Sequence, residues 1–161
     1  KDLWINNCKA LYDGKVYQRG KDGPLVALME TDNAGTHAAS LLELPDGTLL
    51  YAWFSGMEGL DGVVIVVSRL APASDQWTSP MVISAHAGRS NQNPVLFLDP
   101  ATHNVWLFHT SQEAGMGQGT SFVASLSSAD SGRTWTNPEK MGGFTDSGPF
   151  VKGKLLVAEN G

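Results

Sequence analysis

The sequence predicts an all-β protein made of repeated four-stranded sheets, which is the architecture of a β-propeller. The first observation is composition: the 161 residues include 18 glycines, 8 prolines and 5 tryptophans, and only 17% of the residues are charged. The second is patterning, because short apolar runs are separated by strong turn residues and no long amphipathic helix stands out. The third is repetition, because two stretches of the chain follow the same order of strands and turns.

The first repeat is expected near residues 37–85. Its pieces are a strand over 39–44, a Pro-Asp-Gly turn at 45–47, a returning strand over 48–54, a third strand over 63–68 and a degenerate turn that ends at Trp77. Pro, Asp and Gly in succession favour a tight reversal of the chain. The first two strands should therefore pair as an antiparallel hairpin.

The second repeat is expected near residues 91–141. Its pieces are a strand over 94–98, a turn at 99–104, a returning strand over 105–109, a third strand over 121–126 and a closing turn that ends at Trp135. Trp77 and Trp135 each begin a Trp-Thr-x-Pro sequence, and they lie 58 residues apart. These matching endings indicate that the two stretches are copies of one unit.

The closing turn of the second repeat has five characteristic positions. They are Ser128, Asp130, Gly132, Thr134 and Trp135. Hydroxyl and carboxylate groups can bond to the backbone of their own turn, and glycine accepts the positive φ that such a turn needs. The tryptophan ring can pack over the turn and pin it to the sheet. We therefore expect these five residues to be structural.

Partial repeats flank the two full ones. Residues 24–30 read as a lone strand in a partial blade over 15–32, and another copy begins near residue 148 and continues to 161. Two full blades with partial neighbours are fewer than the roughly 4–8 blades of a closed propeller. We expect residues 1–161 to be a single incomplete propeller domain, with the rest of the ring in the same polypeptide or in another chain.

Charge and composition exclude several function classes. The formal net charge of −5 and the absence of a Lys/Arg cluster disfavour nucleic-acid binding. The longest apolar run, residues 63–67, is too short to span a bilayer. The single cysteine, Cys8, excludes an internal disulfide and a cysteine-based metal site, and no metal or cofactor is expected. The first residues show no apolar leader, which leaves a mature secreted protein, a fragment and a cytosolic protein open.

Strand direction separates the two ends of the predicted sheets. The loop after the second strand of each unit and the passage into the next unit share one end, and the closing turn lies at the other. Propeller pockets form where the inner ends of the blades converge, so the first end is the expected place of a site. Its candidate residues are His37, Glu58, Asp61, Arg89, Asn91 and Asn93.

His37 and Asp61 are the candidate catalytic residues. His37 directly precedes an inner strand, where a histidine can serve as acid, base or substrate donor, or be satisfied by neighbouring backbone. Asp61 precedes an apolar run, where a dry pocket would raise the pKa of its carboxyl and suit it to general-acid catalysis. Its alternative role is a cap at the end of the strand.

Glu58, Arg89, Asn91 and Asn93 are the candidate substrate contacts. Glu58 can pair with Asp61 or bind sugar hydroxyls, and the forked guanidinium of Arg89 suits a substrate carboxylate. The two asparagine amides suit recognition of sugar hydroxyls. Each residue also has a structural alternative: a solvated glutamate, a charge on the rim, or amides that lock a turn.

The stretch from His37 to Trp135 resembles the sialidase-like family of Asp-box (BNR) repeat propellers. Besides the closing turn, the resemblance rests on His37-Ala38-Ala39-Ser40, Asp46-Gly47, Trp53-Phe54-Ser55-Gly56, Glu58-Gly59, Asp61 and Asn93-Pro94-Val95-Leu96. It implies a propeller that is six-bladed when complete. It also implies that Asp61 stands where the family has its acid/base aspartate. Sialidases of this family hold the substrate carboxylate with three arginines, and His37 stands in the place of the first.

These observations favour a carbohydrate-active protein, a glycoside hydrolase that removes a terminal sugar from a glycan, with an acidic sugar as one option. Asp61 would donate the proton, and His37 and Arg89 would hold the sugar. The replacement of the first arginine by His37 argues against true sialidase activity. A polysaccharide lyase acting on a uronate-containing glycan and a non-catalytic module for carbohydrate binding or assembly remain open. A glycan partner favours an extracellular or periplasmic location.

Overall fold

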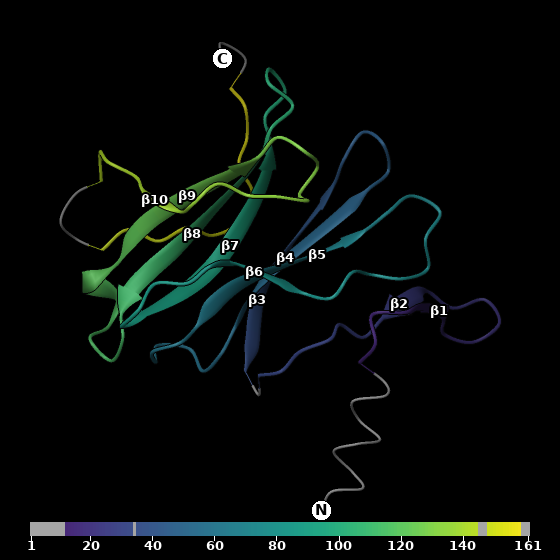
Figure 1. The fold of residues 1–161 in the computed structure, drawn as a ribbon, viewed down its shortest axis with the longest axis horizontal. Helices are drawn as coiled ribbons and strands as arrows, with labels where there is room; N and C mark the ends of the chain where they lie inside the picture. Colours follow the sequence, from purple (N-terminus) through teal and green to yellow (C-terminus); the bar gives the residue numbers. More distant parts are fainter. Residues whose placement is uncertain (1–11, 34, 145–147, 159–161) are drawn as a thin grey trace, which may run out of the picture.

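The computed structural model describes residues 12–33, 35–144 and 148–158 (Figure 1). These residues form a short hairpin, two four-stranded antiparallel sheets and no α-helix, so the all-β prediction is confirmed. The hairpin is β1 (Val16–Gln18) and β2 (Leu25–Ala27). The first sheet is β3 (Thr36–Glu43), β4 (Leu49–Ser55), β5 (Val64–Leu70) and β6 (Met81–Ser84). The second is β7 (Arg89–Leu98), β8 (Val105–Glu113), β9 (Phe122–Ser128) and β10 (Glu139–Lys140), with the 3₁₀ turn η1 (Gln118–Thr120) before β9.

Each four-stranded sheet is a meander, because strands that follow one another in the chain are neighbours in the sheet. The inner strands β3 and β7 contact each other, and the two sheets fan out from them as blades (Figure 1). The blades expected near 37–85 and 91–141 correspond to the sheets that cover 36–84 and 89–140. We call these sheets blade 1 and blade 2.

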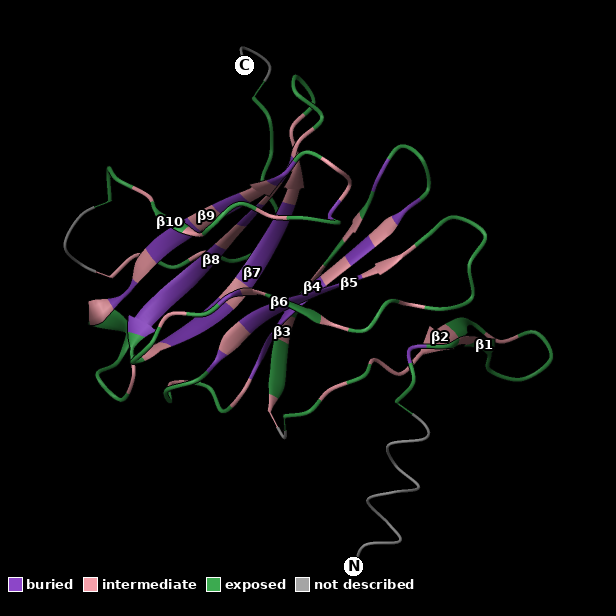
Figure 2. Cartoon of the chain, viewed as in Figure 1, coloured by how far each residue is buried: buried purple, intermediate pink, exposed green. Residues whose placement is uncertain are grey.

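The hydrophobic core fills the space between the two blades. Alternation along β4 turns Leu50, Ala52 and Phe54 toward blade 2, and each of them is at most 1% exposed. Leu107 and Leu126 of blade 2 belong to the same cluster. Figure 2 shows burial concentrated along β4, β5, β7 and β8. Because burying one such side chain stabilises a fold by about 1.5–3 kcal/mol, this face is what joins the blades.

The inner strands of the two blades share one irregularity. The pairing of β3 with β4 shifts between His37 and Ser40, and the pairing of β7 with β8 shifts between Gln92 and Val95. The bulge contains a non-glycine residue of positive φ in each blade, Ala38 at 49° and Asn93 at 54°. The bulge re-aims the backbone at equivalent places, so the repeat extends to backbone detail.

The closing turn of blade 2 fastens the blades at the end away from the expected site. Gly132 lies directly against Leu50, because a Cβ placed on Gly132 would stand 2.6 Å from Leu50 Cδ2. Arg69 of β5 adds a polar contact across the same seam. Its Nε donates to the Ser131 carbonyl at 3.1 Å, and its Nη2 donates to the buried Thr48 hydroxyl at 3.1 Å.

The N-terminal segment differs from the expected lone strand, because it folds back on itself as the β1–β2 hairpin. The hairpin attaches to the degenerate turn of blade 1 through backbone hydrogen bonds: Val16 N–H donates to the Asp75 carbonyl, and Trp77 N–H donates to the Gly14 carbonyl. The missed strand β1 has only three residues, which is too short for a readable alternation.

The described part of the expected next blade, residues 148–158, contains no strand. It runs beside blade 2, where the Pro149 carbonyl accepts a hydrogen bond from the Ser121 hydroxyl and Val151 N–H donates to the Thr110 hydroxyl. Leu156 is 91% exposed, so this segment has no described sheet to pack against. A strand needs a neighbouring strand to pair with, which explains why the apolar pattern of residues 148–158 does not produce a strand here.

Candidate functional site

Three loops meet at the end of the blades opposite the closing turn. We call residues 56–63, 85–88 and 114–121 the rim loops. Their backbones are joined directly: Gly115 N–H donates to the Gly59 carbonyl at 2.8 Å, and Ala114 N–H donates to the Gly88 carbonyl at 3.1 Å. Gly59 N–H also donates to the Ser90 hydroxyl at 3.0 Å. The expected gathering of these loops at one end is therefore what the structure shows.

Asp61 is exposed on the first rim loop. Its Oδ1 accepts two backbone hydrogen bonds, from Gly62 N–H at 2.8 Å and from Gly88 N–H at 2.9 Å. Oδ2 accepts none from the described residues. The dry pocket expected around this carboxyl is not formed by the described part of the chain. What the structure does provide is a carboxylate with one oxygen fixed and the other open to solvent.

His37 and Glu58 form a contact that the sequence did not indicate, with His37 Nδ1 3.4 Å from Glu58 Oε2. Both side chains are more than half exposed. The His37 ring also packs edge-on against Phe54, with ring centroids 5.6 Å apart. This pairing differs from the predicted pairing of Glu58 with Asp61. It leaves Nε2 of His37 facing away from its carboxylate partner.

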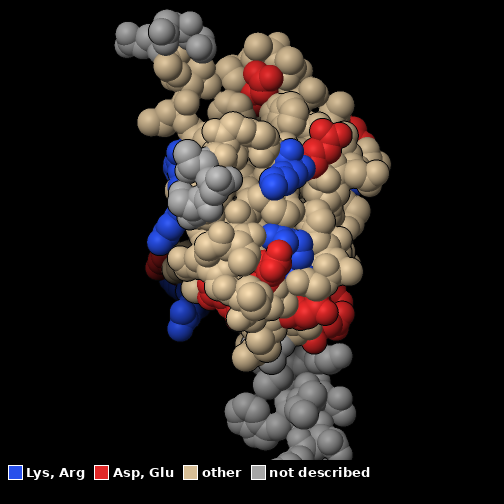
Figure 3. Space-filling model, turned by 90° about the vertical axis from the view of Figure 1, so that its left-hand side faces the viewer, with Lys and Arg blue, Asp and Glu red and all other residues tan. Residues whose placement is uncertain are grey.

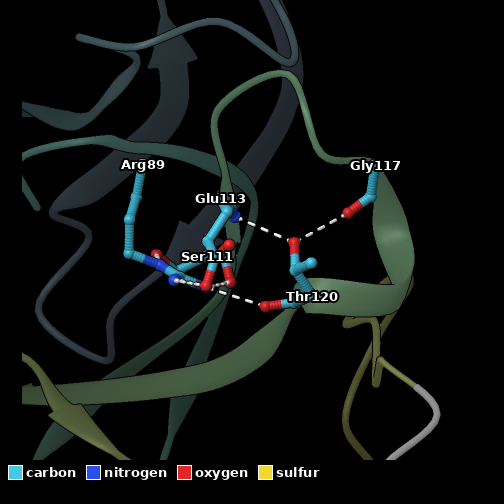
Figure 4. Close-up of polar contacts among 5 residues, drawn as sticks. All are labelled: Arg89, Ser111, Glu113, Gly117 and Thr120. Atoms are coloured by element: carbon cyan, nitrogen blue, oxygen red, sulfur yellow. Dashed lines mark hydrogen bonds and ion pairs between the residues drawn. The ribbon is translucent and has the colours of Figure 1, made fainter.

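Arg89 lies inside blade 2, with its side chain only 17% exposed (Figure 4). Nε donates to the Ser111 hydroxyl at 3.0 Å, and Nη2 donates to the carbonyls of Ser111 at 2.8 Å and Thr120 at 2.9 Å. Nη1 stands 3.7 Å from Glu113 Oε1, and the guanidinium covers the Phe122 ring at 4.5 Å. The expected forked contact with a substrate carboxylate is not available in this arrangement, because Nε and Nη2 donate within the blade and only Nη1 has no hydrogen bond among the described residues.

Asn91 is fully buried between the blades. Its Nδ2 donates to the Val63 carbonyl at 2.9 Å, and its Oδ1 accepts from His86 Nδ1 at 2.9 Å. Because both ends of the amide are satisfied internally, Asn91 joins the blades and does not face a sugar. Asn93 occupies the bulge of β7 and is partly buried, and its role as a sugar contact stays a prediction.

The five residues of the closing turn bond to one another as expected. The Ser128 hydroxyl accepts from Gly132 N–H at 2.8 Å, and Thr134 Oγ1 donates to Asp130 Oδ2 at 2.7 Å. The Trp135 ring packs against the core, and its Nε1 donates to the Gly132 carbonyl at 3.3 Å. The turn is therefore a closed structural unit at the end of the blade opposite Asp61.

Asp130 gives this turn a dependence on pH. The backbone N–H and the hydroxyl of Thr134 are the main reasons why the pKa of the Asp130 carboxyl falls from 3.8 to about 2. A lowered carboxyl pKa stabilises the fold above pH 3.8, and this contribution is lost as the pH falls toward 2. We expect Asp130→Asn to be less stable than the natural chain at pH 7 and to show a shallower loss of stability between pH 4 and pH 2. Denaturant unfolding at each pH measures this, and parallel curves for the two proteins would contradict it.

A buried histidine, His109 of β8, bonds to blade 1 through Ser84. His109 is 0% exposed; its Nδ1 donates to the Thr110 carbonyl at 3.1 Å, and its Nε2 accepts from the Ser84 hydroxyl at 2.8 Å. A carbonyl can only accept, so Nδ1 carries a proton, and in the neutral ring Nε2 is then free to accept from the Ser84 hydroxyl. Burial lowers the pKa of His109 from 6.5 to about 4.

The surface gives little support to a charged macromolecular partner. On the face in Figure 3, Lys and Arg side chains are scattered among acidic ones and form no continuous basic surface. Within residues 12–33, 35–144 and 148–158, no group of three His, Cys, Asp or Glu residues could hold a metal ion. No helix of the same residues is long and apolar enough to cross a bilayer.

Solved structures with the same arrangement of blades are sialidases and related proteins. A Hadza microbial sialidase superposes with a TM-score of 0.59 at 16% identity, over 67% of this chain and 26% of that chain. The intramolecular trans-sialidase of Ruminococcus gnavus gives 0.60 at 13% identity, over 68% and 49%. A Dyadobacter fermentans protein of unknown function gives 0.58 at 16% identity, over 78% and 44%. The chain thus spans between 26% and 49% of the length of these structures.

The meander blades, the closing turn and these superpositions define the class: a sialidase-like propeller, of which this chain forms a part. The family model of the BNR repeat-like domain matches residues 47–161. The chain belongs to this family. Among curated proteins, none matches the chain.

Proposed function

We propose that this chain is part of a glycoside hydrolase that removes a terminal sugar from a glycan, with Asp61 as the proton donor. The observation that carries the proposal is the carboxylate of Asp61 on the rim loops, with Oδ1 held by two backbone N–H groups and Oδ2 open. Membership of the BNR repeat-like family and the sialidase-like fold support carbohydrate chemistry.

The chemistry assigned to Asp61 is protonation of the leaving group. Oδ2 would give its proton to the glycosidic oxygen as the bond to the anomeric carbon breaks, and water would complete the hydrolysis. The remaining blades, in the same polypeptide or another chain, would supply the rest of the site. A glycan substrate also favours an extracellular or periplasmic location.

Replacing Asp61 by asparagine tests this proposal. Asparagine keeps an oxygen for the two N–H groups but cannot supply a catalytic proton, so the fold should persist. We expect kcat/KM for release of the terminal sugar to fall at least about 100-fold in the full-length polypeptide, the scale of a lost general acid. Asp22→Asn, on the exposed turn of the β1–β2 hairpin, is the matched control and should keep its activity. Unchanged turnover in Asp61→Asn would falsify the assignment.

The contact between His37 and Glu58 favours a second candidate, a polysaccharide lyase acting on a uronate. Glu58 would hold Nδ1–H of His37, which would leave Nε2 to remove the proton next to the uronate carboxyl. The glycosidic oxygen on the next carbon would leave with the electrons of its bond and take a proton from solvent, and the product would carry a new carbon–carbon double bond. Its ultraviolet absorbance separates this reaction from hydrolysis.

The inward orientation of Arg89 and Asn91 favours a third candidate, a module that binds or assembles on glycans without catalysis. Neither side chain is then a surface sugar contact, and His37 in place of the first arginine also suits a protein without sialidase chemistry. Glycan binding without any released product would support this reading and exclude both reactions.

A further inference from the structure

Arg89 connects two of the rim loops, because it directly follows residues 85–88 and its side chain binds residues 114–121. Its own residue starts β7, directly after Gly88, and its guanidinium reaches across to Ser111 and Thr120 (Figure 4). The two carbonyls that accept from Nη2 lie on either side of the loop that leaves β8 and enters β9. One side chain therefore fixes both ends of that rim loop.

The same loop is closed on itself through Thr120. Glu113 N–H donates to the Thr120 hydroxyl at 3.0 Å, and this hydroxyl donates to the Gly117 carbonyl at 2.9 Å (Figure 4). Arg89 also binds the Thr120 carbonyl, so a shift of this loop has to break that hydrogen bond together with the two made by the Thr120 hydroxyl. Residues 114–121 are thus a stiff element, although most of them are exposed.

Gly88 connects this stiff element to Asp61. Its carbonyl accepts from Ala114 N–H at 3.1 Å, and its N–H donates to Asp61 Oδ1 at 2.9 Å. The peptide units of Gly88 are therefore fixed from one side by the loop that Arg89 anchors, and they fix the carboxylate on the other side. Glycine at φ +71° has no side chain to hold the turn, so these hydrogen bonds are what orient it.

We propose that Arg89 is a positioning residue for Asp61, acting through Ala114 and Gly88 to fix the orientation of the carboxylate. The hydrogen-bonded chain from Arg89 to Asp61 is independent of the proposed function. Only its purpose, to aim Oδ2 at the leaving group, rests on that function. Lysine cannot replace arginine here, because a single ammonium lacks the planar fork that serves Ser111 and Thr120 together.

Amide hydrogen exchange in the full-length polypeptide, resolved to single residues by mass spectrometry, tests the coupling without any substrate. We expect Arg89→Lys to raise the exchange rate of the Gly88 amide about tenfold, because its bond to Asp61 opens more often. Asp61→Ala, which removes the acceptor of the Gly88 N–H, should raise the same rate. The expected result in the double variant is a smaller increase than the sum of the two, because both changes act on one hydrogen bond.

Two controls separate positioning from general loss of stability. Ser128→Ala removes a buried hydrogen bond in the closing turn at the opposite end and should lower the melting temperature without changing exchange at Gly88. Arg19→Ala, on the exposed hairpin turn, should change neither. The proposal is overturned if Gly88 exchanges at the natural rate in Arg89→Lys, or equally faster in Ser128→Ala.

Turnover provides a second readout. Where the glycan is cleaved, Arg89→Lys should lower kcat about tenfold with little change in KM, because the proton donor is misaligned and no substrate contact is lost. Failure to cleave any glycan with Asp61 intact would remove the proposed function and leave the exchange result standing. A raised KM with unchanged kcat would instead restore Arg89 as a substrate contact and overturn the positioning role.

Discussion

Gly132→Ala is expected to destabilise the chain by about 2–4 kcal/mol, although it adds one methyl group. The positive φ of 79° at Gly132 accounts for about 1 kcal/mol, because a side chain is strained in this region. The rest comes from overpacking, which costs about 1–3 kcal/mol in a close-packed interior. The new Cβ would stand 2.6 Å from Leu50 Cδ2, and Leu50 is 0% exposed and cannot move aside cheaply.

Gly143→Ala is the matched control for this prediction. Gly143 has a similar φ of 84°, but a Cβ there would meet nothing within 4 Å, so only the backbone strain remains. Urea unfolding of the two variants isolates the contact with Leu50, and equal losses would contradict it. Combining Gly132→Ala with Leu50→Ala should recover part of the loss, because the second change makes room for the methyl group.

Acidification is expected to weaken the fold through His109. Its folded pKa of about 4 lies below the ordinary 6.5, so the unfolded chain binds a proton that the folded chain rejects. Stability is therefore fully present above pH 6.5 and falls as the pH drops toward 4. The loss over this window is about 3 kcal/mol, from about 1.4 kcal/mol for each pH unit.

His109→Gln removes this dependence because glutamine does not titrate, while its amide can still pair with Ser84. Carboxyl groups also titrate in this window, so the quantity to compare is the slope of unfolding free energy against pH in each protein. We expect a shallower slope in His109→Gln and the natural slope in His103→Gln, where the imidazole lies in an exposed turn. A steep slope retained in His109→Gln would show that the acid sensitivity arises elsewhere.

Features that depend on near neighbours in the chain could be predicted from the sequence. The bonds among Ser128, Asp130 and Thr134 all lie within one turn, so the residue pattern contains both partners. The hairpins of both blades follow in the same way from alternation and turn chemistry. The degenerate turn of blade 1 was also recognisable, although its attachment to the β1–β2 hairpin was not.

The roles of Arg89 and Asn91 could not be predicted, because their partners are distant in the sequence. Arg89 donates to Thr120, 31 residues away, and Asn91 donates to Val63, 28 residues away. From the sequence alone, a basic residue or an amide at the end of a strand fits a surface contact with substrate as well as it fits a buried structural role. The sequence therefore located the end of the blades where the candidate site lies, but not which side chains there turn inward.

The contacts between blade 1 and blade 2 also set the angle between the two sheets. At one end Gly132 touches Leu50 without a side chain between them, and at the other end Asn91 joins the Val63 backbone. Blade 1 and blade 2 contact each other at both ends and share a filled core, so the angle between the two sheets is fixed. In a ring of similar blades, the sum of such angles must close a full circle. The packing at this seam therefore bears on how many such blades a ring could hold, and Gly132 lets the two sheets approach closely at one end.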